Sequence, residues 1–448
     1  MSKTIKLSKG LDLQIQGALE SPQIAETVTP KVVAIYPDDF PGFTPKPLMH
    51  EGDPIAAGQP LLFDKVNGKV NLVSPADGIV KAIVRGERRK IIRVEVECGN
   101  QGQPEAISTP VNPSAEQIRE ALMASGLWCY LRQRPYDIVP TIDNTPVNIF
   151  VTAFDSAPLA PSLTAMVEGK EKEIAKGVEW LAALTSGKVY ISTRPDSPLS
   201  VPAPAEHVLV SGSHPAGNPG VQAANIAPVN KGQVIWTLDI VTVARIGQLA
   251  LTGRIDWNTN VALVGSEVEN PKMIRTTIGS SITPIIKGNL KPTDKHIRII
   301  SGNVLTGTKV GNDGFLHFPY RQLTVMPEGD DVDEFMGWAS MSPNKMSASH
   351  SFLSSLFHGR KYSPDARLNG GRRAMIMSGQ YDKVLPMDIL PEYLIKAILA
   401  RDIDQMERLG IYEVAPEDFA LCEYVDPSKL ELQKIVRQGL DYLRKELE

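Results

Sequence analysis

The chain has 448 residues, of which 42% are hydrophobic and 22% are charged, and its formal net charge is -4 at pH 7. A chain of this length exceeds one hydrophobic core, so we expect roughly three or four domains, and the near-neutral charge gives no reason to expect a nucleic-acid partner. The N-terminus lacks the apolar stretch of a signal peptide, and no run approaches the roughly 18 apolar residues that span a bilayer, so neither export nor a transmembrane segment is expected.

Residues 1–100 are predicted to form an N-terminal segment followed by a small all-β domain. Turn residues recur between short β-type runs, as in Glu51-Gly52-Asp53-Pro54 and Ser74-Pro75-Ala76-Asp77-Gly78. Short strands at this spacing are typical of small β domains. The sequence EGDPIAAGQPLL followed by SPADGIVKAIV resembles the barrel-sandwich hybrid of lipoyl and biotinyl carrier domains.

This carrier resemblance directs attention to Lys65. Carrier domains attach their prosthetic group to a lysine on an exposed hairpin, and Lys65 lies near the corresponding position upstream of Pro75. The methionines that flank a biotinyl lysine are absent, and the turn dipeptide Asn67-Gly68 leaves no lysine at the apex. A carrier-type protein modified at Lys65 is therefore the alternative function, and a solvated lysine is the simpler interpretation.

Residues 101–256 are predicted to form a Rossmann-like α/β domain. After a linker at 101–113, Ser114 and Gln117 have the spacing of a capping box for a helix that reaches about Tyr130. Strands then alternate with amphipathic helices, which favours a sheet with parallel strands. The strands are expected at 147–153, 188–192 and 207–210, and the helices at 164–186 and 239–252.

The segment SGLWCYLRQRP at 125–135 stands where a strand–helix fold would keep a glycine-rich cofactor loop. Such a loop needs residues without Cβ, because consecutive backbone N–H groups must converge on the phosphate. Leu131, Arg132 and Arg134 are bulky, and Pro135 has no N–H to donate. The segment predicts that this phosphate cradle is missing.

The loop at 211–220 is glycine-rich and follows a predicted strand, where ligand sites collect. Its glycine spacing matches neither the dinucleotide nor the P-loop pattern, and Pro215 and Pro219 remove two donors. We expect a rigid surface loop here.

The second half of the chain is predicted to contain a β-rich and a helical unit. Residues 257–330 are expected to form a β-grasp domain of the soluble ligand-binding type, because four predicted strands have few helical residues between them. A connecting segment with an amphipathic helix follows at 331–380. Apolar residues at helical spacing then predict a C-terminal helical domain at 381–448. The whole is a multidomain α/β protein.

Cysteine and histidine spacing argues against a resident metal. Cys98, Cys129 and Cys422 are far apart in sequence and form no CxxC pair, and the seven histidines show no HxxxH or HExxH pattern. Four-thiolate zinc and iron–sulfur sites are therefore not expected. We predict no metal site in this chain.

Eight segments, in order along nearly the whole chain, resemble one family. They are KGLDLQIQG, SGLWCYLRQRP, NIFVTAFDSAPLA, LTSGKVY, SGSHPAGNPG, IGQLALTG, RIISGNVLTGT and AMIMSGQYDKVLPMD. The chain resembles the A subunit of the sodium-translocating NADH:quinone reductase. This family is similar to the flavin-carrying subunit of respiratory complex I and to the C subunit of the Rnf complex.

The resemblance implies a peripheral subunit on the cytoplasmic face of the bacterial inner membrane. The resemblance implies five other subunits in the complex, and the chief partner of this chain would be a membrane-embedded one. The complex couples NADH oxidation and quinone reduction to sodium export. Flavins and an iron–sulfur centre are expected on other subunits, and no cofactor is expected in this chain. The cluster-bearing relatives carry several cysteines in the C-terminal region, whereas Cys422 stands alone here.

Two groups of residues are candidates for function within such a complex. A quinone site needs an apolar or aromatic slot and a donor for the carbonyl oxygens. An aromatic loop at 36–43, predicted to be exposed, and the donors that follow Leu131 supply such residues, although Phe40 and Phe43 are also suited to anchoring one domain on another. The quinone-contact candidates are Tyr36, Phe40, Phe43, Arg132, Arg134 and Tyr136.

The segment 350–358 has apolar residues on one predicted helical face and a basic stretch after it. An apolar face beside basic residues can lie against a membrane subunit or anionic headgroups, and an ordinary core helix with a solvated loop is the other interpretation. The docking candidates are Phe352, Leu353, Leu356, Phe357, Arg360 and Lys361.

Overall fold

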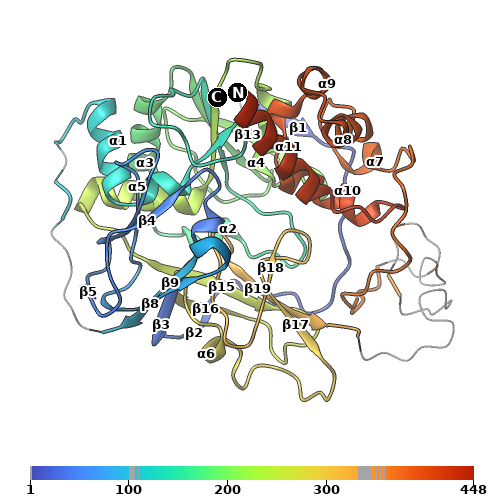
Figure 1. Ribbon diagram of the computed structural model, residues 1–448, viewed down its shortest axis with the longest axis horizontal. Helices are drawn as coiled ribbons and strands as arrows, with labels where there is room; N and C mark the ends of the chain where they lie inside the picture. Colours follow the sequence, from blue (N-terminus) through green and yellow to red (C-terminus); the bar gives the residue numbers. More distant parts are fainter. Residues whose placement is uncertain are drawn as a thin grey trace.

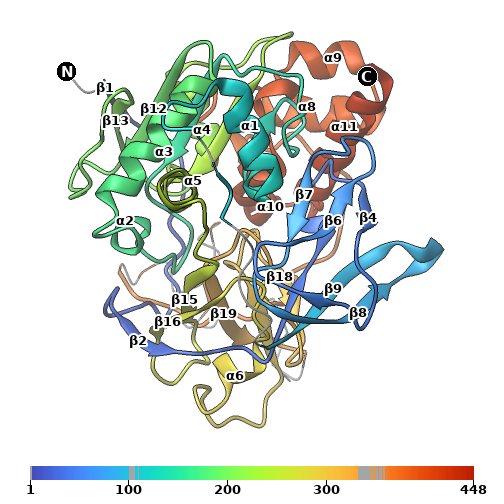
Figure 2. The same ribbon diagram turned by 90° about the vertical axis from the view of Figure 1, so that its left-hand side faces the viewer.

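The computed structural model describes residues 3–99, 106–108, 110–330, 345, 346, 348, 352, 356 and 359–447. Within these residues the strands form four sheets, and most of the helices lie beside one of them or at the C-terminal end (Figures 1 and 2). The helices of the described ranges include none with the length and apolar character needed to cross a membrane.

The predicted N-terminal β domain consists of two small antiparallel sheets. Their strands are short because turn residues interrupt the chain every few positions. The core between them contains Val33, Leu62, Val80 and Val96, none of which is exposed. One sheet has the order β3 (Val32–Ile35), β9 (Ile91–Cys98), β8 (Gly78–Arg85), β5 (Pro54–Ile55), and the other β4 (Pro45–Pro47), β6 (Pro60–Asp64), β7 (Asn71–Val73).

The second unit is a six-stranded sheet in which five strands are parallel and one edge strand is antiparallel. Along β11, Ile149 and Val151 pack with the helices of one face, while Phe150 packs with those of the other. Successive side chains of a strand point to opposite faces, so this apolar run is buried on both sides. The order is β1 (Lys3–Lys6), β13 (Glu206–Ser211), β12 (Lys188–Thr193), β11 (Asn148–Thr152), β14 (Ile235–Asp239), β10 (Arg132–Arg134).

The capping box at Ser114 is confirmed, since its hydroxyl accepts from the N–H of Gln117 and the Gln117 side chain accepts from the N–H of Ser114. Helix α1 spans Ala115–Ala124 and therefore ends earlier than predicted. The prediction of one continuous helix at 164–186 is wrong. The segment is split into α2 (Leu163–Met166) and α3 (Glu171–Leu184), because Gly169 adopts a φ of +77° that a helix interior does not allow.

Helix α5 (Ile240–Thr252) nearly matches the predicted range 239–252; Asp239 caps its start, and Gly253 follows its last residue. It packs closely on α3 at two glycines. A Cβ at Gly177 would overlap the carbonyl of Val243, and a Cβ at Gly247 would overlap the carbonyl of Glu173. The two helix backbones therefore approach each other as only glycine permits.

The edge strands β1 and β10, strand β14 and helix α4 (Pro219–Ile226) of this unit were not predicted. Strand β14 follows a short loop, and α4 begins inside the predicted loop at 211–220. The surface position predicted for that loop is also wrong, because His214 is only 3% exposed and the chain near Asp12 covers it.

The third unit is a mixed sheet with the short helix α6 (Thr283–Ile286). Its edge strand β2 (Ile24–Thr27) comes from the N-terminal segment, as β1 does in the previous sheet. The first thirty or so residues therefore tie two units together by β pairing. The order is β18 (Thr308–Val310), β17 (Ile297–Ser301), β19 (Gln322–Pro327), β15 (Asn258–Val264), β16 (Lys272–Thr277), β2.

The C-terminal helices form the cluster drawn in orange to red in Figure 1. They pack on α4 and on one face of the parallel sheet, and Cys422 lies in their core with no exposure. The helices are α7 (Tyr381–Val384), α8 (Pro391–Ala400), α9 (Ile403–Arg408), η6 (Ile411–Glu413), η7 (Pro416–Phe419), α10 (Ala420–Val425) and α11 (Leu432–Leu447). The short turns η1 (Pro37–Asp39), η2 (Glu87–Arg89) and η3 (Leu127–Tyr130) belong to earlier parts of the chain.

Candidate functional site

A cavity of about 450 Å³ lies at the carboxyl ends of β11 and β14. The strand order reverses between these two strands, and open α/β sheets bind ligands at such a reversal. Thr152 and Asp239 end the two strands at the cavity, and the segment Phe318–Gln322 of the third unit and Glu417 of the C-terminal helices form other walls. We call this space the interdomain cleft.

The N-terminus of α4 reaches the cleft, but Arg134 occupies the space in front of it. A Cβ at Gly220 would overlap the Arg134 guanidinium. That guanidinium donates from Nη1 to Asp418 Oδ2 and to the Glu413 carbonyl, each at 2.6 Å, and its side chain is 1% exposed. A phosphate at this helix end would have to displace a buried arginine that is already paired.

The segment that precedes Arg134 is part of the core. Leu127, Trp128 and Cys129 have no exposure, and the indole of Trp128 donates to the Pro140 carbonyl at 2.8 Å. Trp128 also packs edge-on against Trp236, with 5.2 Å between ring centroids. Large side chains thus fill this stretch, as its composition predicted.

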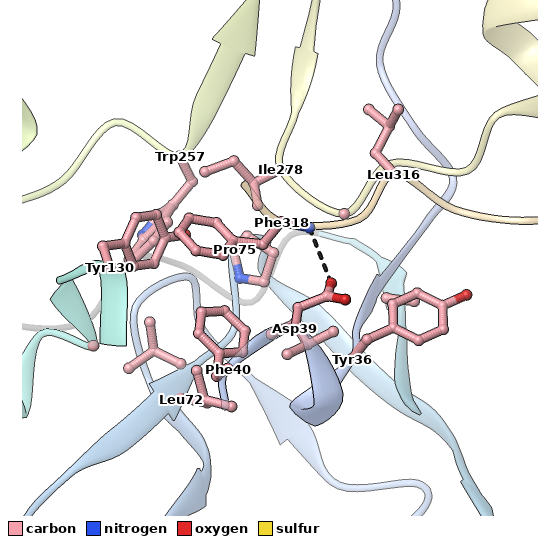
Figure 3. Close-up of a pocket in the computed structure, with 15 residues that line it drawn as sticks. Tyr36, Asp39, Phe40, Leu72, Pro75, Tyr130, Trp257, Ile278, Leu316 and Phe318 are labelled. Atoms are coloured by element: carbon pink, nitrogen blue, oxygen red, sulfur yellow. Dashed lines mark hydrogen bonds between the residues drawn. The ribbon is translucent and has the colours of Figure 1, made fainter. Parts of the chain in front are cut away.

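Next to the cleft, an aromatic slot lies where the β domain, the α/β unit and the third unit meet (Figure 3). Phe40 stacks on Phe318 with 4.8 Å between centroids, and Tyr130 meets Phe318 edge-on at 4.4 Å. Trp257 and Leu316 complete the wall drawn at the top of Figure 3. The open volume is only about 30 Å³, so the rings pack nearly in contact with each other.

Asp39 supplies the polar edge of the slot. Its carboxylate accepts from the backbone N–H of Phe318 at 2.9 Å and contacts His317 Nδ1 at 2.8 Å. Burial raises the pKa of Asp39, and the hydrogen bond with His317 acts against this rise. Tyr36 stacks on the His317 ring at 3.9 Å, so the loop and the third unit are joined by both apolar and polar contacts.

The structure brings only some of the quinone-contact candidates together. Tyr36 and Phe40 line the slot, and Arg132 lies over the rings of Phe40 and Phe318 at 5.9 and 5.5 Å. The predicted exposure of the aromatic loop is wrong, because Phe40 is 5% and Phe43 8% exposed. Phe43 is in the core and does not line the slot.

Arg134 and Tyr136 face a different neighbour. Arg134 is bound by the C-terminal helices, and Tyr136 is buried in the same apolar cluster as those helices. The expectation that both supply donors to an open pocket is therefore wrong. Sequence reasoning also missed Asp39, His317 and Phe318, whose role depends on pairings across more than 270 positions.

An ion pair between Arg321 and Asp239 lines the interdomain cleft. Arg321 donates from Nη1 and Nη2 to the two carboxylate oxygens of Asp239, at 2.7 and 3.1 Å. Burial alone would raise the pKa of Asp239, but this ion pair outweighs it and holds the pKa below its ordinary value. Asp239 also accepts from the N–H of Thr242, and this bond caps α5.

The predicted docking segment is described only in part. Leu353 and Phe357 lie outside the described residues, so the helix predicted at 350–358 stays a prediction. Leu356 is 70% exposed, and Phe352 lies under the ammonium of Lys345 at 5.6 Å. Arg360 and Lys361 are exposed, and the main chain of Lys361 accepts from the amide of Gln16.

Three family models and several curated relatives match the chain. The NqrA N-terminal barrel-sandwich hybrid domain matches residues 5–99, the NqrA second alpha/beta domain residues 113–255 and the NQRA C-terminal domain residues 260–312. The A subunit of the Na(+)-translocating NADH-quinone reductase of Hahella chejuensis is 38% identical, covering 99% of this chain and 100% of the relative. Its counterpart from Vibrio atlanticus is 36% identical over the same shares.

The chain belongs to the NqrA family, the A subunits of Na(+)-translocating NADH-quinone reductases. The barrel-sandwich hybrid and α/β units predicted from the sequence are confirmed by this match. Among solved structures, an NAD+-reducing NiFe-hydrogenase in the H2-reduced state reaches a TM-score of 0.38 at 12% identity, covering 75% of this chain and 62% of that one. A similarity this low carries no argument.

In this member of the NqrA family, the described residues include no group of three or more His, Cys, Asp or Glu side chains placed to hold a metal ion. Arg321 and Asp239 of the cleft are paired with each other. Among the described residues, His214 contacts Ser156 Oγ through Nδ1 at 3.0 Å, while its buried Nε2 has no hydrogen-bond partner.

His214 predicts a loss of stability in acid. Burial lowers its pKa to about 4, below the ordinary value of 6.5. A group with a depressed folded-state pKa stabilises the fold above its unfolded pKa and loses that contribution as the pH falls, so the free energy of unfolding should drop by up to about 3 kcal/mol between pH 6.5 and 4. Urea denaturation at several pH values measures this.

Two variants complete the pH experiment. His214→Gln should flatten the dependence, because no imidazole remains to be protonated. His50→Gln should leave it unchanged, since the His50 side chain is 91% exposed. Equal slopes in the His214→Gln variant and the unmodified chain would show that other groups cause the acid sensitivity.

Proposed function

We propose that this chain serves as the NqrA subunit of a Na(+)-translocating NADH-quinone reductase, a translocase complex that oxidises NADH, reduces quinone and exports sodium. The observation that carries the proposal is the match to a curated NqrA relative at 38% identity over 99% of this chain. The chain would act as a peripheral subunit on the cytoplasmic face of the bacterial inner membrane. Its partners would be five other subunits, chiefly a membrane-embedded one.

We further propose that the aromatic slot contributes to a quinone site. Phe40, Tyr130 and Phe318 offer flat apolar faces for a ring, and Arg132 offers a guanidinium beside them. A slot of about 30 Å³ is too small for a quinone ring, so the ring would have to enter by separating Phe318 from Phe40. The neighbouring cleft gives the route, because Asp39, Tyr130 and Phe318 line both spaces.

The chain would carry out this role without a flavin or iron–sulfur cluster of its own. Support comes from Arg134, which occupies the helix terminus that a cofactor phosphate would need. The flavins and the iron–sulfur centre would lie on other subunits. Electron transfer would then depend on the assembled complex, and the isolated chain should not oxidise NADH.

The finer fold assignments are proposals of the same kind. Parallel strands covered by helices on both faces support a Rossmann-like unit at 101–256, and the mixed sheet with α6 supports a β-grasp unit at 257–330. The remaining boundaries are 1–100 for the N-terminal segment and barrel-sandwich hybrid, 331–380 for the connecting segment and 381–448 for the helical unit.

Photolabelling of the assembled complex tests the quinone proposal. A photoreactive quinone analogue should label peptides that contain residues 36–43, 127–132 or 316–321, and excess unlabelled quinone should suppress the label. Phe40→Ala should reduce the labelling of these peptides, whereas Phe63→Ala, in the same β domain but away from the slot, should not. Label confined to other subunits would reject a quinone contact here and leave a structural role.

The alternative of a carrier modified at Lys65 has weaker support. The turn after β6 is closed by Asp64, whose carboxylate accepts from the N–H groups of Val66 and Asn67. Lys65 is exposed in this turn, but it does not occupy the apex. An intact mass equal to that of the unmodified chain would exclude this alternative.

A further inference from the structure

A second cavity of about 450 Å³ lies apart from the cleft and the slot. Its walls are the turn between α2 and α3, one side of α5, and strands β15 and β16, and the N-terminal segment at 22–24 closes one edge. Figure 2 shows α2, β2, β15 and β16 on this side of the molecule. Three cationic side chains line it, namely Lys170, Arg245 and Arg275.

Arg245 is a buried cation that forms no direct ion pair with any of the described residues. Its side chain belongs to α5, the residue is 5% exposed, and Nη2 donates to the Asn258 carbonyl at 2.9 Å. Among the described residues no carboxylate oxygen lies within 4.0 Å of its guanidinium, and the nearby Asp239 is already bound by Arg321. A buried charge without a directly paired opposite charge destabilises the fold, and a bound anion would offset this cost.

Lys170 adds a second cation with no partner. It lies just before α3, is half-buried, and its ammonium has no hydrogen-bond or ion-pair partner among the residues described. Burial lowers the pKa of Lys170; the carboxylate of Asp256 acts against this fall, and the charges of Arg245 and Arg275 add to it. Lys170 and the two arginines line the same cavity.

The third cation is partly neutralised. Arg275 of β16 pairs with Asp256 at 3.2 Å, and its side chain is 44% exposed. Neutral polar side chains of Asn258, Thr259 and Asn260 share the wall with it. The cavity thus combines three cations with neutral hydrogen-bonding groups and with two carboxylates, those of Asp256, which pairs with Arg275, and of the exposed Glu168.

We propose that this cavity binds a phosphate group, held by Lys170, Arg245 and Arg275. Guanidinium and ammonium groups form charge-assisted hydrogen bonds to phosphate oxygens, and two or more cations suit a phosphate dianion better than a monovalent ion. The volume exceeds that of the ion alone, so an organic group on the phosphate also fits. The phosphate can come from the free ion, a soluble phosphomonoester or a lipid headgroup.

Calorimetric titration of the full chain at constant ionic strength tests the proposal. The probes are inorganic phosphate, ribose 5-phosphate and phosphatidylcholine vesicles containing phosphatidate, with chloride as the balancing anion. The probe that binds most tightly identifies the source of the phosphate group. Binding of none of the three would overturn the proposal.

Two lysine variants at the start of α3, one at the cavity and one exposed, test whether binding occurs at this site. Lys170→Gln should weaken binding of the best probe by about tenfold or more, the loss expected for one charge-assisted hydrogen bond. Lys172→Gln removes an exposed charge from the same helix and should leave the affinity unchanged. An affinity of the Lys170→Gln variant equal to that of the unmodified chain would overturn the proposal, whether or not a variant of the buried Arg245 folds.

Discussion

Arg134→Met is expected to lower the free energy of unfolding by about 3–5 kcal/mol, the usual cost of removing one partner of a buried ion pair. The Arg134 side chain is 1% exposed, and Asp418, its main partner, has no exposure. Burial alone would lower the pKa of Arg134, but the carboxylates of Asp418 and Glu417 outweigh it and raise the pKa. Without the guanidinium, the Asp418 carboxylate would be buried and uncompensated.

Urea denaturation followed by circular dichroism measures the loss. Arg134→Met combined with Asp418→Asn should be less unstable than the sum of the single variants, since no unpaired charge remains between these two positions. Arg372→Met removes an exposed ion pair with Glu431 and should cost less than about 1 kcal/mol. A similarly small loss of stability in the Arg134→Met variant would mean that the Arg134–Asp418 ion pair does not hold the C-terminal helices on the α/β unit.

Phe40→Ala is expected to cost about 3–5 kcal/mol, in the range for removing a large aromatic side chain from a core. Phe40 is 5% exposed and stacks on Phe318, and Arg132 lies over its ring. The substitution would leave a cavity where three units meet. The hydrogen bonds of Asp39 with His317 and Phe318 would persist, so the contacts between the units should weaken without being lost.

Thermal unfolding and limited proteolysis of the variant measure this effect. Cleavage should appear first near the junction between the β domain and the third unit. Phe40→Leu keeps most of the apolar contact and should cost much less, and Phe63→Ala is the matched control because that ring is only partly buried. Equal stability of Phe40→Ala and Phe63→Ala would show that the slot does not join the units.

Local sequence signals predicted three of the six strands and some of the helix termini of the α/β unit. The capping box at Ser114 forms as its spacing indicates, and α5 nearly matches the predicted range 239–252, because both depend on residues within a few positions. The prediction of one helix at 164–186 was wrong because the apolar periodicity of the sequence continues across Gly169, where the helix is interrupted. Helix α4 was missed because Pro and Gly at its start are typical of a loop.

The site was less predictable than the fold. Tyr36, Phe40 and Arg132 were identified as a group from their chemistry, and the structure does bring them together. Arg134 has the same chemistry and lies two positions further along β10, about 7 Å away on the same face of the strand. Different parts of the chain cover these two places, because Arg132 donates to the Asp39 carbonyl whereas Arg134 donates to the C-terminal helices.

The amino-acid sequence by itself determined the family, the kinds of domain in the first half of the chain and the presence of large residues at 125–135, because these are properties of local composition and of similarity along the chain. Only the tertiary structure decided which side chains meet. Asp39 pairs with His317 across 278 positions and Arg134 with Asp418 across 284, and no local signal specifies contacts at such separations. The same reason explains why no stretch of sequence reveals that Lys170, Arg245 and Arg275 line one cavity.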